Sequence, residues 1–149
     1  MKHKKIYLTT IITLLIDIIS KVIITNTLTL KESIKIINKF FYITYTKNTG
    51  VAFSLLEGSK IFIIIATIII LIVLIKYLNN KYVNRLEQIS YGLIIGGALG
   101  NLIDRIIYGY VIDFLDFKIF NYNYPIFNLA DSAIVIGVII LIITSFKRK

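Results

Sequence analysis

The chain has 149 residues, of which 57% are hydrophobic, and its mean hydropathy is +0.83. Soluble domains contain about 45–50% apolar residues, so this composition indicates an integral membrane protein. The sequence has no cysteine, which excludes disulfides, thiol nucleophiles and thiolate metal sites. The net charge of +9 could suggest a nucleic-acid partner, but the sequence offers no basic soluble module, and we expect none.

Long stretches of sequence without charge predict four transmembrane helices in a single integral membrane domain that covers residues 1–149. Crossing a bilayer core of about 30 Å requires roughly 20 predominantly apolar residues in each helix. The apolar stretches place these helices at about 6–25, 61–78, 88–107 and 128–146. The expected fold class is therefore an all-α membrane protein.

The first apolar segment is interrupted by Asp17 and Lys21 and follows a basic start, so it shares features with a secretory signal peptide. No small-x-small cleavage site follows, and the apolar stretch continues beyond Lys21. We therefore expect this segment to be a retained first helix.

The segment between the first two predicted helices contains a candidate strand. Residues 40–46 are all aromatic or β-branched, and they are followed by the turn signal Asn48-Thr49-Gly50. This pattern predicts a short strand and a hairpin, with residues 51–54 as the return strand. Aromatic residues here also suit the membrane interface.

Glycines recur at every fourth position of the third predicted helix, at Gly92, Gly96 and Gly100. Small residues at this spacing allow a neighbouring helix to approach closely. Gly97 widens the same face. The pattern predicts tight helix packing and does not by itself indicate chemistry.

The distribution of lysine and arginine predicts the orientation in the membrane. Cations are densest in the amino-terminal tail, in residues 76–85 and in the carboxy-terminal tail. The two outer segments carry lysines spread over longer loops. Because cytoplasmic loops are enriched in these residues, we expect both termini in the cytoplasm.

The aspartates gather around the outer ends of the third and fourth predicted helices. Asp104, Asp113, Asp116 and Asp131 fall between positions 104 and 131, whereas Asp17 lies in the first helix. An ionisable group within or at the edge of an apolar segment is costly and therefore indicates function. Two carboxylates near one membrane face can perform acid–base chemistry on water, because their repulsion keeps one proton shared between them.

Several of these residues also have a purely structural interpretation. Asn128 and Asp131 match the N-cap and third position of a helix, where they would stabilise its start. Asp104 with Arg105 could be an interfacial anchor. Asp116 lies in a polar loop, and we expect it to be solvated.

Five sequence blocks occur in an order and at a spacing that match a known family. They are DIISK at 17–21, NTGVAFS at 48–54, GGALGNLIDR at 96–105, VIDF at 111–114 and FNLADS at 127–132. Together they resemble the motifs of lipoprotein signal peptidase, also called signal peptidase II, over nearly the whole chain.

The resemblance implies an aspartic endopeptidase of the bacterial inner membrane. It would remove the signal peptides of diacylglyceryl-modified prolipoproteins, cutting just before the lipidated cysteine. Asp113 and Asp131 would be the catalytic pair. The residues that would line the site and hold the substrate are Asn48, Asn101, Arg105 and Asn128. The supporting polar residues would be Asp17, Lys21 and Asp104.

The family likeness also implies the surroundings of the site. Residues 40–54 would form a small β-structured cradle on the extracytoplasmic face, where the active site would lie. The expected partners are the lipidated prolipoproteins and membrane lipid, and we expect a monomer without metal or cofactor.

The residues themselves favour the pair of Asp113 and Asp131 only in part. Asp131 would begin the fourth helix, whose dipole favours an ionised carboxylate and thus a general base. Asp113 would then hold the shared proton. Asp104 remains an alternative partner, because it lies on the same helix face as Asn101.

Two other function classes remain open from the residues alone. A proton-coupled transporter would use intramembrane acids as a relay, but such sites lie near the bilayer midplane, whereas most aspartates here lie near the outer ends. A structural membrane subunit would explain the glycines but would leave Asp113 and Asp131 without a task.

Overall fold

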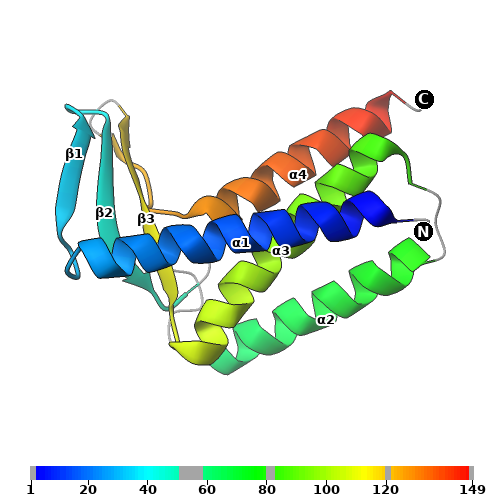
Figure 1. Ribbon diagram of the computed structural model, residues 1–149, viewed down its shortest axis with the longest axis horizontal. Coiled ribbons are helices and arrows are strands. Elements are labelled where there is room, and N and C mark those ends of the chain that lie inside the picture. The colour runs from blue at the N-terminus through cyan, green and yellow to red at the C-terminus, as the bar shows by residue number, and fades with distance from the viewer. Residues whose placement is uncertain (1–2, 51–58, 80–82, 120–121, 148–149) are drawn as a thin grey trace.

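The computed structural model describes residues 3–50, 59–79, 83–119 and 122–147 (Figure 1). Its elements, in chain order, are α1 (Lys4–Thr27), β1 (Ser33–Ile37), β2 (Phe41–Asn48), α2 (Lys60–Asn79), α3 (Arg85–Ile107), β3 (Val111–Ile119), β4 (Tyr122–Asn123) and α4 (Leu129–Phe146). The expectation of a mainly helical membrane protein with a small sheet is thereby confirmed.

In the described part of the chain, three helices are long and apolar enough to cross a membrane: α1, α2 and α4. The most apolar of them is α2, with a hydropathy of 3.0 over its best window. Only 17% of that window is buried inside the protein, so its aliphatic side chains point outward. Apolar side chains exposed all along a helix find their favourable environment in lipid.

Helix α3 lies at the centre of the bundle and packs against α1, α2 and α4. A methyl group on Gly96 would lie 2.8 Å from the carbonyl oxygen of Thr10 on α1. A methyl group on Gly137 of α4 would lie 2.7 Å from the carbonyl oxygen of Ser90 on α3. The glycines therefore permit the close packing that their spacing predicts, between α3 and two neighbouring helices.

The strands form an antiparallel sheet that, in the described residues, has the order β1-β2-β3-β4. Strand β2 pairs with β1 on one side and with β3 on the other. The predicted strand at 40–46 thus exists, but its hairpin partner is β1, which precedes it. The predicted return strand at 51–54 lies outside the described residues.

The sheet also corrects the expected origin of the β structure. The sequence placed it between the first two helices, but β3 and β4 come from the segment between α3 and α4. Residues far apart in the chain therefore meet in one sheet, such as Thr46 opposite Asp113. The pairing of β2 with β3 therefore joins the segment between α1 and α2 to the segment between α3 and α4.

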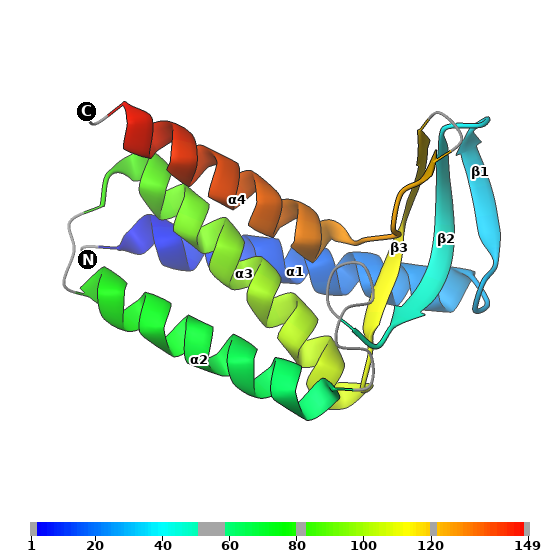
Figure 2. The same ribbon diagram turned by 180° about the vertical axis from the view of Figure 1, so that it is seen from behind.

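The sheet lies at one end of the helical bundle, with β3 nearest to α3 and α4, whereas α1 extends alongside the sheet as far as β1 (Figures 1 and 2). A hydrophobic cluster joins the carboxyl end of α1 to the sheet. Its buried members are Ile24, Leu28, Tyr45, Ile112 and Phe114. The cluster fixes the sheet relative to the helices, and so it fixes β3 over the start of α4.

Candidate active site

The start of α4 is a capping box made by Asn128 and Asp131. The side-chain oxygen of Asn128 accepts the backbone N–H of Asp131 at 2.9 Å, and the Asp131 carboxylate accepts the backbone N–H of Asn128 at 3.2 Å. The structural interpretation of these two residues is therefore correct. Because Asn128 has no exposed surface, its remaining side-chain nitrogen must be satisfied within the protein.

That nitrogen of Asn128 links three elements. It donates to a carboxylate oxygen of Asp113 on β3 at 2.7 Å and lies 3.1 Å from the side-chain oxygen of Asn101 on α3. Asn101 in turn donates its amide to Asp131 at 2.7 Å. Asn128 thus caps α4 and at the same time connects the two aspartates.

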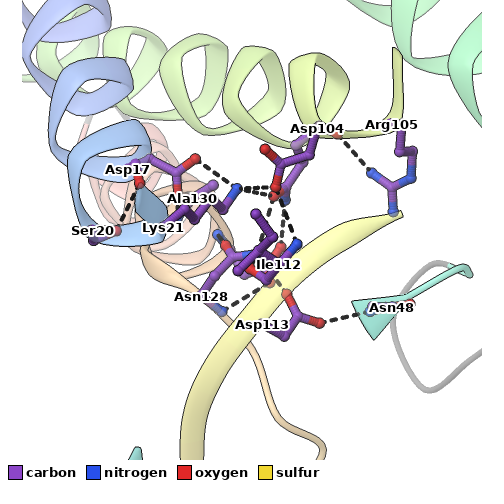
Figure 3. A network of polar contacts seen from close by, with 12 residues as sticks. Asp17, Ser20, Lys21, Asn48, Asp104, Arg105, Ile112, Asp113, Asn128 and Ala130 are labelled. Atoms are coloured by element: carbon purple, nitrogen blue, oxygen red, sulfur yellow. Dashed lines mark hydrogen bonds and ion pairs between the residues drawn. The ribbon is translucent and has the colours of Figure 1, made fainter. Parts of the chain in front are cut away.

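Asp113 lies at a position of β3 that leaves it only 1% exposed. Its second carboxylate oxygen accepts the side-chain N–H of Asn48, at the end of β2, at 2.9 Å (Figure 3). Burial, together with the nearby charge of Asp131, raises the pKa of Asp113 from 3.8 to about 7, although the amides of Asn48 and Asn128 oppose the shift. Asp113 can therefore hold a proton at neutral pH.

A buried cation supports Asn101 from the side of α1. The Lys21 ammonium lies 2.7 Å from Asp17, 2.9 Å from Asp104 and 3.1 Å from the side-chain oxygen of Asn101. All these partners are buried, so removal of one of them would leave an uncompensated buried charge, which is costly. Figure 3 shows Lys21 between the two carboxylates.

Both carboxylates around Lys21 also bind backbone groups of other elements. Asp17 accepts the N–H of Ala130, in the first turn of α4, at 3.0 Å. Asp104 accepts the N–H of Ile112, beside Asp113 on β3, at 3.1 Å. The network therefore holds β3 and α4 in place, and one carboxylate oxygen of Asp104 takes part in it through both Lys21 and Ile112.

Arg105 reaches toward the loop after β2. One guanidinium nitrogen donates to the carbonyl oxygen of Gly50 at 2.7 Å, and another lies 3.4 Å from the carbonyl oxygen of Asn101. The Arg105 guanidinium, which is buried, thus connects α3 to the loop that follows β2.

A cavity of about 960 Å³ opens beside these residues. The polar residues that line it, among those described, include Asn48, Asn101, Arg105, Asp113 and Asp131. Its other wall is apolar and includes Tyr124, Phe127, Ile134, Val135 and Ile136. The volume falls in the range of pockets that hold a ligand, with the two aspartates on one wall.

One sequence interpretation needs revision. Asp116 is not solvated: it lies on β3, is only 8% exposed and accepts the hydroxyl of Thr44 at 2.8 Å. Asp104 is not among the described residues that line the cavity, whereas Asp113 and Asp131 are. The backbone partners at Gly50, Ile112 and Ala130 were not predicted, because backbone contacts between distant segments leave no signal in side-chain identity.

The arrangement has the components of acid–base chemistry on water. Two carboxylates face one cavity, Asp113 is buried enough to hold a proton, and Asp131 accepts two N–H groups. Such a pair can activate a water molecule with one carboxylate and polarise a carbonyl with the other. This is the chemistry of aspartic peptidases.

Known proteins share both the sequence and the fold. A profile of the signal peptidase (SPase) II family matches residues 9–147. The lipoprotein signal peptidase of Halothermothrix orenii is 43% identical over 97% of each chain. That of Staphylococcus aureus strain RF122 is 41% identical and covers 97% of this chain and 93% of its own.

Solved structures agree with these matches. One bacterial membrane enzyme, solved by the in meso method at 2.3 Å, has a TM-score of 0.88 and 41% identity, covering 95% of this chain and 87% of its own. A second, solved by the same method at 1.9 Å, has a TM-score of 0.86 and 40% identity, covering 97% and 94%. The chain therefore belongs to the signal peptidase II family of membrane-embedded proteases.

Proposed function

We propose that this chain removes the signal peptides of diacylglyceryl-modified prolipoproteins, cleaving just before the lipidated cysteine, with Asp113 and Asp131 as the catalytic pair. The observation that carries the proposal is that both carboxylates line one cavity and are joined through the buried Asn128. Family membership supports the substrate class.

In the proposed mechanism, Asp131 accepts a proton from a water molecule, whose oxygen attacks the carbonyl carbon of the scissile bond. Asp113 holds the second proton and donates it to the carbonyl oxygen, which gives a tetrahedral intermediate. The intermediate collapses when Asp131 donates its proton to the leaving amine nitrogen and the C–N bond breaks. Asp113 takes back a proton from one hydroxyl of the intermediate, which gives the new carboxyl group and restores the pair. The pKa of Asp113, about 7, supports its role as the proton donor.

We assign the neighbouring amides and Arg105 to substrate and carboxylate positioning. A peptide bond in a transmembrane signal helix must be unwound before cleavage, and its freed backbone groups then need partners. Asn48 and Arg105 lie on the cavity wall and are suited to supply them. Asn101 and Asn128 would mainly orient Asp131 and Asp113.

We further propose that all four helices cross the membrane as one domain over residues 1–149, and that the chain acts as a monomer. Connectivity supports a crossing by α3, because α2 ends at the side of the bundle away from the sheet and α3 returns to the sheet (Figure 2). The 23 residues of α3 span about 34 Å, enough for a bilayer core. The sheet and cavity would then face the extracytoplasmic side of the bacterial inner membrane, with both termini in the cytoplasm.

Incubation of the purified protein with a lipidated and an unlipidated precursor tests the substrate class. The proposal expects cleavage of the lipidated precursor, with the new amino terminus at the modified cysteine, and at least a tenfold lower kcat/KM for the unlipidated form. Equal cleavage of both precursors would exclude recognition of the lipid. Cleavage of neither would refute the proposed substrate class.

A further inference from the structure

A row of aromatic rings crosses the sheet, and the proposed mechanism does not use it. Its neighbouring ring centroids are 5.9 Å apart for Tyr124 and Phe127, 5.7 Å for Phe127 and Phe117, 4.6 Å for Phe117 and Phe41, and 5.6 Å for Phe117 and Phe40. These separations lie in the range of attractive aromatic pairs. We call these five rings the aromatic row.

The aromatic row remains partly uncovered. Phe40 is 44% exposed and Tyr124 is 42% exposed, and the other three rings are half-buried. An uncovered set of stacked rings outside the helices is an apolar surface that is available to a ligand.

One end of the row lies in the proposed catalytic cavity, because Tyr124 and Phe127 both line it. Phe127 directly precedes Asn128, and its backbone is fixed by hydrogen bonds of 2.8 and 3.2 Å to Leu115 on β3. The position of this ring is thus tied to the two aspartates. A substrate bound at Asp113 and Asp131 would therefore contact Tyr124 and Phe127, the first rings of the row.

The other end of the row leads away from α3 and α4. It passes from β3 to the start of β2, and β2 lies farther from these two helices than β3 does (Figures 1 and 2). The cavity is also lined by Ile134, Val135 and Ile136, which follow Asp131 along α4. The apolar lining of the cavity therefore includes residues of the aromatic row and residues of α4.

We propose that the aromatic row binds the polypeptide segment that follows the lipidated cysteine, through apolar or aromatic side chains of that segment. This inference rests on the proposed function. The signal helix and the acyl chains would leave along α4, which has exposed aliphatic residues facing lipid. The segment after the cut bond would leave over the sheet, where rings can stack on its side chains.

The row would therefore act as a specificity subsite. Binding energy from groups away from the reacting bond lowers KM without altering kcat when it is the same in the ground and transition states. Loss of one aromatic contact should then raise KM by about two- to tenfold.

Two diacylglyceryl-modified precursor peptides test the proposal. They differ only in the residues after the cysteine, which are apolar and aromatic in one and Gly-Ser in the other. Wild type is expected to cleave the apolar precursor with a KM at least threefold lower. Phe117→Leu is expected to remove that preference by raising KM for the apolar precursor, while kcat/KM for the Gly-Ser precursor keeps its wild-type value, which also shows that the variant is folded.

Ile36→Ser is the matched control, because Ile36 is 54% exposed on β1 but is not part of the aromatic row. It should keep the wild-type preference. Equal KM values of wild type for the two precursors would overturn the proposal. An equal rise of KM for both with Phe117→Leu would also overturn it, and would assign the row to the acyl chains. Failure of wild type to cleave either precursor would instead refute the proposed function.

Discussion

The side chain of Asn128 caps α4 with its oxygen and holds Asp113 with its nitrogen. Asn128→Ser separates the two tasks, because serine can cap a helix but has no amide to donate. We expect the melting temperature to fall by more than a cap exchange alone would cause, because serine also leaves the buried Asp113 carboxylate and the Asn101 side-chain oxygen without the Asn128 amide. Cleavage activity should fall by at least tenfold, because Asp113 loses its shortest hydrogen bond.

Asn84 provides the control for this substitution. It caps α3 with the same capping box, with Glu87 in place of Asp131, at the other end of the bundle from the sheet. Asn84→Ser exchanges only the cap, so it should lower the melting temperature by less than Asn128→Ser does and leave kcat/KM unchanged. If Asn128→Ser keeps full activity, the amide of Asn128 has no role in catalysis.

The pKa of Asp113 determines the expected pH dependence. Because this pKa is raised to about 7, the carboxyl is protonated below pH 7 and ionised above it. As the proton donor, it should make kcat/KM fall about tenfold per pH unit above this value. By linkage, the same shift makes the free energy of unfolding decrease as pH rises from about 4 to about 7.

Asn48 offers a way to move this titration. Its amide favours the ionised form of Asp113, so Asn48→Leu should raise the pKa and shift the alkaline limb of kcat/KM to higher pH. Thr46→Val is the control, because the Thr46 hydroxyl donates to the backbone oxygen of Asp113 and not to its carboxylate. If the alkaline limb of kcat/KM lies at the same pH in Asn48→Leu as in the wild type, Asp113 is not the titrating group.

The sequence allowed the pairing of Asp113 with Asp131 to be proposed through motif order, but it misplaced Asp116. The difference has a physical cause. The partner of Asp116 is Thr44, which lies 72 positions away on another strand. A carboxylate in a polar stretch looks solvated when its cross-strand partner is unknown, so local composition could not predict its burial.

At the scale of elements, the helices could be predicted and the sheet only in part. Apolar runs long enough to cross a bilayer identify a helix locally. Strand β3 contains Asp113 and Asp116, which interrupt an apolar pattern, and its pairing with β2 joins segments from opposite halves of the chain. Such pairing depends on the helices that bring the segments together, so sequence pattern alone did not reveal it.

The close packing of α3 against α4 predicts that substitutions at the adjacent residues Gly137 and Val138 have different effects on stability. A methyl group on Gly137 would lie 2.7 Å from the carbonyl oxygen of Ser90, whereas Val138 is 41% exposed. We expect Gly137→Ala to destabilise the protein by about 1–3 kcal/mol through overpacking. Val138→Ala should change the melting temperature little. Equal melting temperatures of the two variants in detergent would contradict this packing account.

At the scale of the whole molecule, the proposed topology places the sheet and the cavity on the extracytoplasmic side of the membrane, and cysteine labelling can test this. The chain has no cysteine, so single cysteines can report topology without background. With a membrane-impermeant thiol reagent on intact bacterial spheroplasts, Lys35→Cys should be labelled. Asn79→Cys and Ser145→Cys, at the opposite ends of α2 and α4, should be labelled only after the membrane is permeabilised. Labelling of Asn79→Cys in intact spheroplasts would contradict the proposed four crossings.

The catalytic pair can be tested most directly by single-turnover cleavage of a lipidated precursor by Asp113→Asn, Asp131→Asn, Asp104→Asn and Asp116→Asn. We predict that Asp113→Asn and Asp131→Asn lose about 10²- to 10⁴-fold in rate, because each removes a proton-transfer group. Asp116→Asn should retain its activity, since asparagine can still accept the Thr44 hydroxyl. Full activity of Asp113→Asn, together with complete loss in Asp104→Asn, would contradict the account.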